Sequence, residues 1–241
     1  MLKNLKPLYG DKLGALDGNV GHVKDFYFDD QNWAVRYVVA DTGSWLTGRQ
    51  VLLSPHAFGS LHQAGNLLLV NLRRKQIEDS PSIETHKPVS RQYEEEYHRY
   101  YGWPFYWQGG SLWGMSDYPT AALPVMPPQG EPTTANRPQS ERPDAHLRST
   151  RAVAGYHLQA SDGVIGHVCD FLVDPQTWAI RELVIKIGHR FSGKEVQIPT
   201  SQVERISFDA STVFVGMTQQ AVERNTTFQL APAGAADSRL I

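Results

Sequence analysis

Short apolar runs separated by turn-forming residues recur along the chain, and this pattern predicts strands. Residues 33–39 read Trp-Ala-Val-Arg-Tyr-Val-Val, which has the aromatic and β-branched content of a central strand. Asp17-Gly18 is typical of a two-residue hairpin turn, and the Asp-Asp-Gln-Asn of residues 29–32 is typical of a second turn. Apolar positions change parity near Gly21, which indicates a β-bulge. The pattern predicts a meander of about five or six short strands.

The pattern occurs twice, at a constant offset of 145 residues that places Asp17 on Asp162. Sixteen of the 37 residue pairs between Asp17 and Leu53 and their counterparts are identical, which is far above chance, so the chain contains two copies of one unit. We place the copies at residues 8–81 and 153–226. Because neither copy contains an amphipathic helix of useful length, its sheet has to curl on itself. This predicts an all-β fold with two tandem small barrels.

The order of motifs in each copy resembles the PRC-barrel superfamily. In the first copy these motifs are Asp17-Gly18, the Gly-x-Val-x-Asp-Phe of residues 21–26, the Trp-x-Val-Arg-Tyr-x-Val of residues 33–39 and the run that continues to Pro55. The match is to stand-alone bacterial members and covers somewhat over half of the chain. It implies a small β-barrel, like the cytoplasmic barrel of the H subunit in photosynthetic reaction centres and the C-terminal domain of the ribosome maturation factor RimM. Family members share a scaffold and not a reaction, so the resemblance implies a macromolecule-binding role only by analogy.

These observations predict five regions. Residues 1–81 form the first PRC-type barrel domain, and residues 151–230 form the second. Between them, residues 82–118 form a short helix and an aromatic segment. Residues 119–150 form a flexible linker, with seven prolines between Pro119 and Pro143. Residues 231–241 are a C-terminal tail.

The segment between the copies predicts one helix with an aromatic face. Ser90 is a suitable N-cap for a helix that begins at Arg91, and Gly102 followed by Pro104 ends it. Tyrosines recur there at three- and four-residue spacing, opposite Glu94, Glu95 and Arg99. Two interpretations stay open: the segment covers an open side of the first barrel or the groove between the barrels, or it is an interaction patch. The candidate partner-binding residues are Tyr97, Tyr100, Tyr101, Trp103, Phe105, Tyr106, Trp107 and Trp113.

Titratable residues form no catalytic or metal-binding pattern. His22 and Asp25 recur as His167 and Asp170, but residues three apart on a strand point to opposite faces, and zinc requires three or four converging ligands. The usual nucleotide-binding, nucleophile-elbow and helical zinc motifs are absent from the sequence. Cys169 corresponds to Lys24 in the other copy, so the unit does not require a thiol. We expect no enzyme activity, no catalytic residues, no metal and no cofactor.

We expect two pairs of equivalent residues to stabilise the fold rather than to bind a ligand. Arg36 and Arg181 lie on strands expected to pair with those that carry Asp25 and Asp170, which predicts cross-strand ion pairs. Trp33 and Trp178 begin strands with apolar neighbours, so we expect their rings to plug the barrels.

Composition narrows the class of partner. The 23 Lys and Arg residues are balanced by 25 Asp and Glu without a basic patch, so nucleic acid is not the expected partner. One cysteine, a start without an apolar signal core and the lack of any run of about 20 apolar residues predict a cytoplasmic location without a transmembrane segment. We expect a non-enzymatic adaptor or scaffold that binds a protein partner through its barrels and aromatic insert, with peripheral association at a membrane-associated complex. The alternative is a small-molecule or RNA-binding module with a site between the two barrels.

Overall fold

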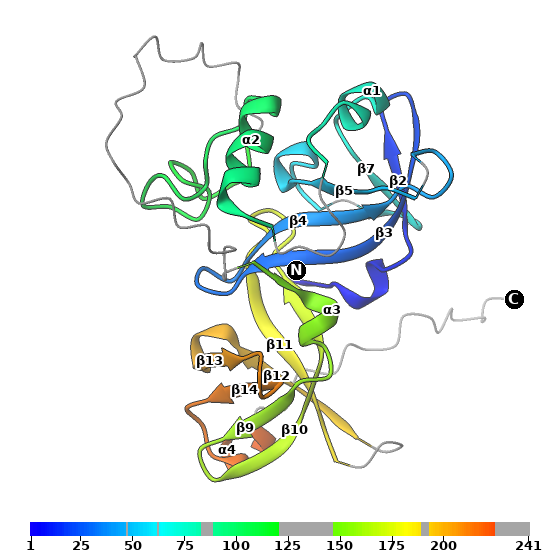
Figure 1. The fold of residues 1–241 in the computed structure, drawn as a ribbon. Coiled ribbons are helices and arrows are strands. Elements are labelled where there is room, and N and C mark those ends of the chain that lie inside the picture. The colour runs from blue at the N-terminus through cyan, green and yellow to red at the C-terminus, as the bar shows by residue number, and fades with distance from the viewer. Residues whose placement is uncertain (47, 62, 83–88, 121–146, 189–192, 225–241) are drawn as a thin grey trace, which may run out of the picture.

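The computed structural model describes residues 1–46, 48–61, 63–82, 89–120, 147–188 and 193–224. They form a mostly β structure with two sheets, one in each repeat, drawn one above the other in Figure 1. The first sheet has the strand order β5-β4-β3-β2-β7-β6, and only β2 and β7 in this order are parallel neighbours. Its elements are β2 (Lys12–Ala15), β3 (Gly18–Asp29), β4 (Ala34–Asp41), β5 (Gln50–Leu53), the 3₁₀ turn η2 (Pro55–Ala57), β6 (Gln63–Ala64), β7 (Leu67–Leu69) and the helix α1 (Arg74–Glu78).

The second sheet repeats this arrangement. Its order is β12-β11-β10-β9-β14-β13, again with one parallel pair, β9 and β14. The prediction that both copies share one strand order is therefore confirmed. Its elements are β9 (His157–Ala160), β10 (Gly163–Val173), β11 (Ile180–Ile187), β12 (Lys194–Pro199), η3 (Thr200–Gln202), β13 (Val203–Ser207), β14 (Thr212–Val215) and α4 (Gln219–Arg224).

The first hairpin differs by one residue from the prediction. Ala15 pairs with Gly18, so the two-residue loop is Leu16-Asp17 rather than Asp17-Gly18, and the Asp17 carboxylate accepts the Arg74 backbone N–H at the start of α1. The predicted bulge is present, because the register of β2 and β3 shifts between Leu13 and Gly14 next to Gly21. Gly21 has φ +139°, and a Cβ there would lie 2.0 Å from the carbonyl oxygen of Asp41, so only glycine fits this close approach.

The two repeats exchange short arms. β1 (Lys3–Asn4), followed by the 3₁₀ turn η1 (Lys6–Leu8), precedes the first repeat but pairs with β10 of the second sheet. β8 (Leu147–Ser149), followed by α3 (Thr150–Val153), precedes the second repeat but pairs with β3 of the first sheet. The predicted flexible linker over residues 119–150 is therefore too long at its C-terminal end. The prediction for residues 121–146 and for the tail lies outside the described residues.

The exchanged arms account for the repeated aspartates. The Asp25 carboxylate accepts hydrogen bonds from the Ser149 and Thr150 hydroxyls and from the Arg151 backbone N–H. Its counterpart Asp170 accepts from the Asn4 side chain at 2.7 Å and from the Lys6 backbone N–H at 2.8 Å. The predicted ion pairs of Arg36 with Asp25 and of Arg181 with Asp170 are therefore wrong. The two arginines pair with Asp29 and Asp174 instead, and the carboxylates of Asp25 and Asp170 accept hydrogen bonds from the arms.

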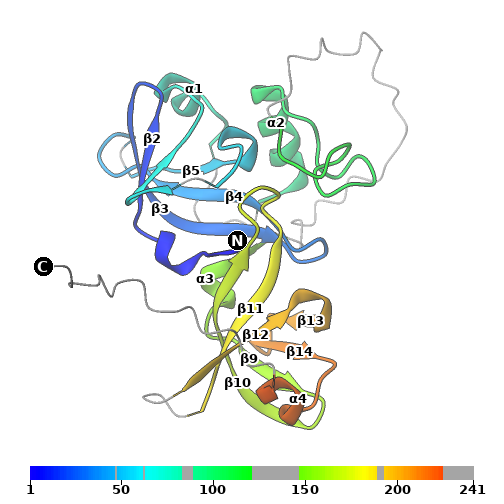
Figure 2. The same cartoon turned by 180° about the vertical axis from the view of Figure 1, so that it is seen from behind.

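One apolar core joins the repeats. A single cluster of buried side chains contains residues of both sheets, and the rings of Phe28 and Phe171 lie 5.7 Å apart across the junction. At the junction, the backbone N–H of Val35 donates to the Trp178 carbonyl, and the N–H of Ile180 donates to the Trp33 carbonyl. Seen from behind (Figure 2), the loop between β10 and β11 reaches the first repeat, where the Leu61 N–H donates to the Pro175 carbonyl at 2.6 Å.

The full chain is expected to unfold in one transition. The shared core and exchanged arms mean that neither repeat can lose its packing without exposing apolar surface of the other. Differential scanning calorimetry should give equal calorimetric and van't Hoff enthalpies. Two resolved transitions would show that the repeats fold independently.

Candidate binding cleft between the two repeats

Residues 91–118, here called the aromatic cover, pack against the first sheet as α2 (Arg91–Tyr101) followed by an irregular coil (Figure 1). The Ser90 hydroxyl accepts the Tyr93 N–H at the start of α2, and Gly102 ends the helix with φ +69°. Both predicted ends are therefore confirmed.

The eight candidate partner-binding residues differ in exposure. Tyr97, Tyr106 and Trp113 are buried and belong to the core clusters. Tyr101, Trp103, Phe105 and Trp107 are half-buried, and Tyr100 is 42% exposed. The aromatic cover is therefore part of the fold of the first repeat, which is the first of the two interpretations. Partner binding by its exposed edges stays a prediction.

A buried polar network fixes α2 to β4. Glu94, predicted on the exposed face of the helix, is completely buried and accepts hydrogen bonds from the hydroxyls of Tyr37 (2.9 Å) and Tyr106 (2.7 Å). His98 Nδ1 donates to the Pro104 carbonyl at 2.9 Å, and its Nε2 lies 3.2 Å from the Tyr37 hydroxyl. Burial lowers the pKa of His98 to about 3, so the ring is neutral at physiological pH.

Stability should fall as pH decreases from about 6.5 towards 4. Burial lowers the folded-state pKa of His56 to about 4 and that of His98 to about 3, whereas an unfolded histidine titrates near 6.5. In this interval the unfolded chain binds more protons than the folded chain, so acid favours unfolding, and above pH 6.5 the effect disappears. Melting temperatures measured from pH 7.5 to 4.5 test this. His56→Asn should flatten the slope, and His157→Asn at an exposed position should not; a flat wild-type profile would contradict the account.

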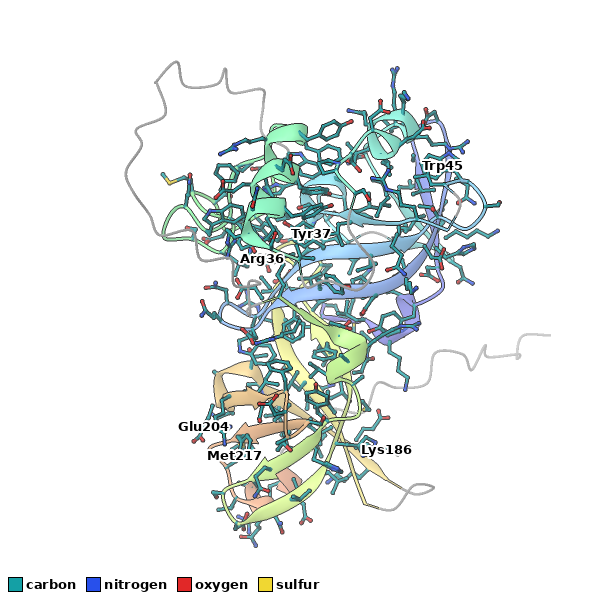
Figure 3. All side chains as sticks on the ribbon, in the orientation of Figure 1. Arg36, Tyr37, Trp45, Lys186, Glu204 and Met217 are labelled. Atoms are coloured by element: carbon teal, nitrogen blue, oxygen red, sulfur yellow. The ribbon has the colours of Figure 1, made fainter. Side chains whose placement is uncertain are left out.

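Arg36 connects β4 to the coil of the aromatic cover. Its guanidinium is 1% exposed, lies 3.0 Å from the Asp29 carboxylate and donates to the Leu112 carbonyl at 2.6 Å. It also lies over the ring of Tyr106, at 3.9 Å from the centroid; Figure 3 shows Arg36 and Tyr37 beside α2. Burial alone raises the pKa of Asp29, but Arg36 and the donors of Asn32 outweigh it and hold the pKa below its ordinary value.

Trp113 lies at the junction of the repeats. Its indole N–H donates to the Thr177 carbonyl of the second repeat at 2.8 Å. Its ring lies 5.1 Å from the ring of His56 and 4.9 Å from the Arg36 guanidinium. The aromatic cover therefore ends by inserting one indole ring between residues of both repeats.

An open cleft of about 490 Å³ lies beside this junction. The aromatic cover forms one wall with Leu112, Asp117 and Tyr118. The two repeats form the rest, with Asn32, Trp33, Thr177, Ala179, Ile180, Arg181, Thr200 and Ser201. Its lining combines hydrogen-bonding groups with apolar surface.

The two tryptophans predicted to be plugs differ in this region. Trp178 is buried as predicted, its ring packs on Phe58, and its indole N–H donates to the Gly59 carbonyl at 2.8 Å. Trp33 is only half-buried, stacks on Phe28 and lines the cleft. Both adopt positive φ, 51° for Trp33 and 58° for Trp178, a conformation uncommon outside glycine. One of the two predicted plugs is therefore available to a ligand.

Further features of the described residues concern metal ions, membranes and the reactivity of the cysteine. Within the described ranges, no three His, Cys, Asp or Glu side chains lie close enough to hold a metal ion, and no helix there is long and apolar enough to cross a bilayer. Burial raises the pKa of the Cys169 thiol to about 11, so little reactive thiolate forms at neutral pH.

Comparison with known proteins adds no relative. Neither a scan against protein-family models nor a search of curated proteins finds a match to this chain. The cleft residues Asn32, Arg181, Thr200 and Ser201 were not predicted as site residues. Three of them, Asn32, Thr200 and Ser201, differ from their counterparts Thr177, Pro55 and His56, which is a partial signal in the repeat, whereas Arg181 is identical to Arg36 and gives none.

Proposed function

We propose that this protein is a non-enzymatic adaptor that binds a segment of a partner protein in the cleft between its two repeats. The observation that carries the proposal is the cleft itself, which both repeats and the aromatic cover build together. Trp33 and Arg181 supply an aromatic surface and a 55% exposed guanidinium there, and these residue types are the common anchors of protein interfaces.

The motif order of each copy supports a finer part of the proposal, that each sheet is a PRC-type barrel. We also propose that the protein acts in the cytoplasm, because its single cysteine cannot form an intramolecular disulfide. The PRC domains it resembles contact other macromolecules, which favours an adaptor role at a larger complex, including a membrane-associated one. The half-buried rings at the edge of the aromatic cover, such as Trp103 and Trp107, then enlarge the binding surface.

A small organic ligand is the second candidate, favoured by one observation. The cleft volume of about 490 Å³ lies within the range of roughly 300–1,000 Å³ that such ligands occupy. RNA is less well supported, because Arg181 in the cleft lining is offset by Asp117.

Filling the cleft tests the proposed function. Ser201→Trp places a large side chain at an exposed position of the lining, and Val164→Trp adds the same side chain at the exposed end of the β9–β10 hairpin. Both variants and the wild type are used as baits in the native cell, with quantitative mass spectrometry. Specific partners should be lost with Ser201→Trp and kept with Val164→Trp. If all three baits capture the same set, the cleft is not the binding site.

A further inference from the structure

The junction has near two-fold symmetry, so each residue there has a counterpart 145 positions away. The hydrogen bond from Val35 N–H to the Trp178 carbonyl has its counterpart in the bond from Ile180 N–H to the Trp33 carbonyl. Ala34 and Ala179 meet each other in a single antiparallel bridge. The exchanged arms obey the same relation, since Lys3 opposite Val173 corresponds to Arg148 opposite Phe28.

This symmetry relates the cleft to the place that Trp113 occupies. Trp113 contacts Thr177, His56 and Arg36, and the preceding carbonyl of Leu112 accepts from Arg36. The residues 145 positions away from these three are, in the same order, Asn32, Ser201 and Arg181. All three line the open cleft.

The counterparts again supply an arginine and a backbone carbonyl, with Ser201 in place of His56, but they are exposed. Arg36 is 1% exposed and lies 3.0 Å from Asp29, whereas Arg181 is 55% exposed and lies 3.9 Å from Asp174. The carbonyl of Thr177 accepts the indole N–H of Trp113, whereas the carbonyl of Asn32 accepts no hydrogen bond from any residue that the structure describes. No described residue occupies the second position as Trp113 occupies the first.

The indole N–H of Trp33 differs from that of its counterpart Trp178 in the same way. In the second repeat, the indole N–H of Trp178 donates to the backbone carbonyl of Gly59. The equivalent indole N–H of Trp33 has no acceptor among the described residues, although its ring lines the cleft. The cleft therefore presents donors from Trp33 and Arg181 that match backbone carbonyls, and an acceptor at Asn32 that matches an indole N–H.

We infer that the cleft is the open counterpart of the Trp113 position and binds a tryptophan side chain of the partner protein together with the adjoining backbone. The partner's indole N–H donates to the Asn32 carbonyl, and Arg181 donates to the carbonyl of the residue that precedes the tryptophan. Trp33 donates to a further backbone carbonyl of the segment. The inference rests on the proposed function, and the chain's own Leu112-Trp113 is the template for the partner sequence.

The test uses that template as a free peptide. The probe has the sequence of residues 110–115, Gly-Ser-Leu-Trp-Gly-Met, capped at both ends, and the control peptide has Ala in place of Trp. Each is titrated into the ¹⁵N-labelled full chain. The Trp peptide should give saturable shifts of the amides of Arg181 and Ser201, and the Ala peptide should give none. Shifts confined to the aromatic cover, or no shifts, would overturn the inference.

Two arginine variants test whether Arg181 contacts the Trp peptide. Arg181→Gln should weaken the Trp peptide by about tenfold or more, since a hydrogen bond from a charged donor is lost. Arg205→Gln, at an exposed position outside the cleft lining, should leave its affinity unchanged. Equal binding by the wild type and Arg181→Gln would remove Arg181 from the site and overturn the assignment.

The experiments distinguish a failure of the adaptor function from a failure of the tryptophan inference. If Ser201→Trp loses partners in the cell but the Trp peptide neither binds nor displaces those partners, the adaptor function stands and the tryptophan inference is wrong. If the peptide binds at Arg181 but no partner depends on the cleft, the tryptophan position exists and the adaptor function is wrong.

Discussion

Replacing Trp113 with alanine is expected to lower the free energy of unfolding by about 3–5 kcal/mol, as for other fully buried aromatic side chains. Trp113 is 1% exposed, and its ring lies against His56 and Arg36 from the first repeat while its indole N–H donates to Thr177 of the second. The substitution removes apolar burial and a hydrogen bond and leaves a cavity at the junction. Urea unfolding of the full chain followed by circular dichroism measures the loss.

A control and a rescue distinguish this effect from a general weakening of the aromatic cover. Trp107→Ala should cost clearly less, because Trp107 is half-buried and lies over Arg91 at the outer edge. Added indole should raise the melting temperature of the Trp113→Ala variant more than that of the wild type, since a ligand that fills the cavity stabilises only the folded state. Similar stability of Trp113→Ala and the wild type would contradict the account.

Replacing Asp25 with alanine is expected to cost about 2–4 kcal/mol, because several donors on the exchanged arm lose their acceptor together. Thr150 and the Arg151 backbone N–H both donate to this carboxylate from across the junction. Asp170→Ala should have a similar effect through Asn4 and Lys6.

The histidine of the same motif is the matched control for this second substitution. His22 is exposed, so His22→Ala should change stability by less than about 0.5 kcal/mol. Thermal and urea unfolding of both variants test whether Asp25 stabilises the fold by itself, through the exchanged arm, or only together with His22. A similar loss in His22→Ala and Asp25→Ala would indicate that the two side chains act together after all.

The repeat made much of the architecture predictable. A gapless offset requires the two copies to place their strands alike, so one shared strand order followed from pairs such as Asp17 and Asp162. The ends of α2 were also predictable, because Ser90 and Gly102 act locally, through the first and last turns of the helix.

The exchanged arms were not predictable, because β1 has two residues and β8 has three, too few to show a periodic pattern. Glu94 was placed on the wrong face since helical spacing alone does not reveal that Tyr37 and Tyr106 supply buried hydrogen-bond donors. Arg36 was given the wrong partner for a related reason: tertiary contacts with the arms decide which aspartate is free to pair.

The candidate site depends on a difference between the copies. Equivalent residues such as Arg36 and Arg181 have the same identity in the sequence, and only the position of the aromatic cover makes one buried and the other exposed. Sequence comparison of the copies finds these pairs, but the structure is needed to determine which member of each pair is covered.

The central claim is that partners bind in the cleft between the repeats. An aromatic photo-crosslinking amino acid in place of Tyr118, an exposed aromatic residue of the cleft lining, tests it most directly in the native cell, with the same amino acid at Val164 as the reference position. We expect a discrete crosslinked partner at Tyr118, lost when Arg181→Gln is added, and none at Val164. Crosslinks at Val164 but not at Tyr118 would contradict binding in the cleft.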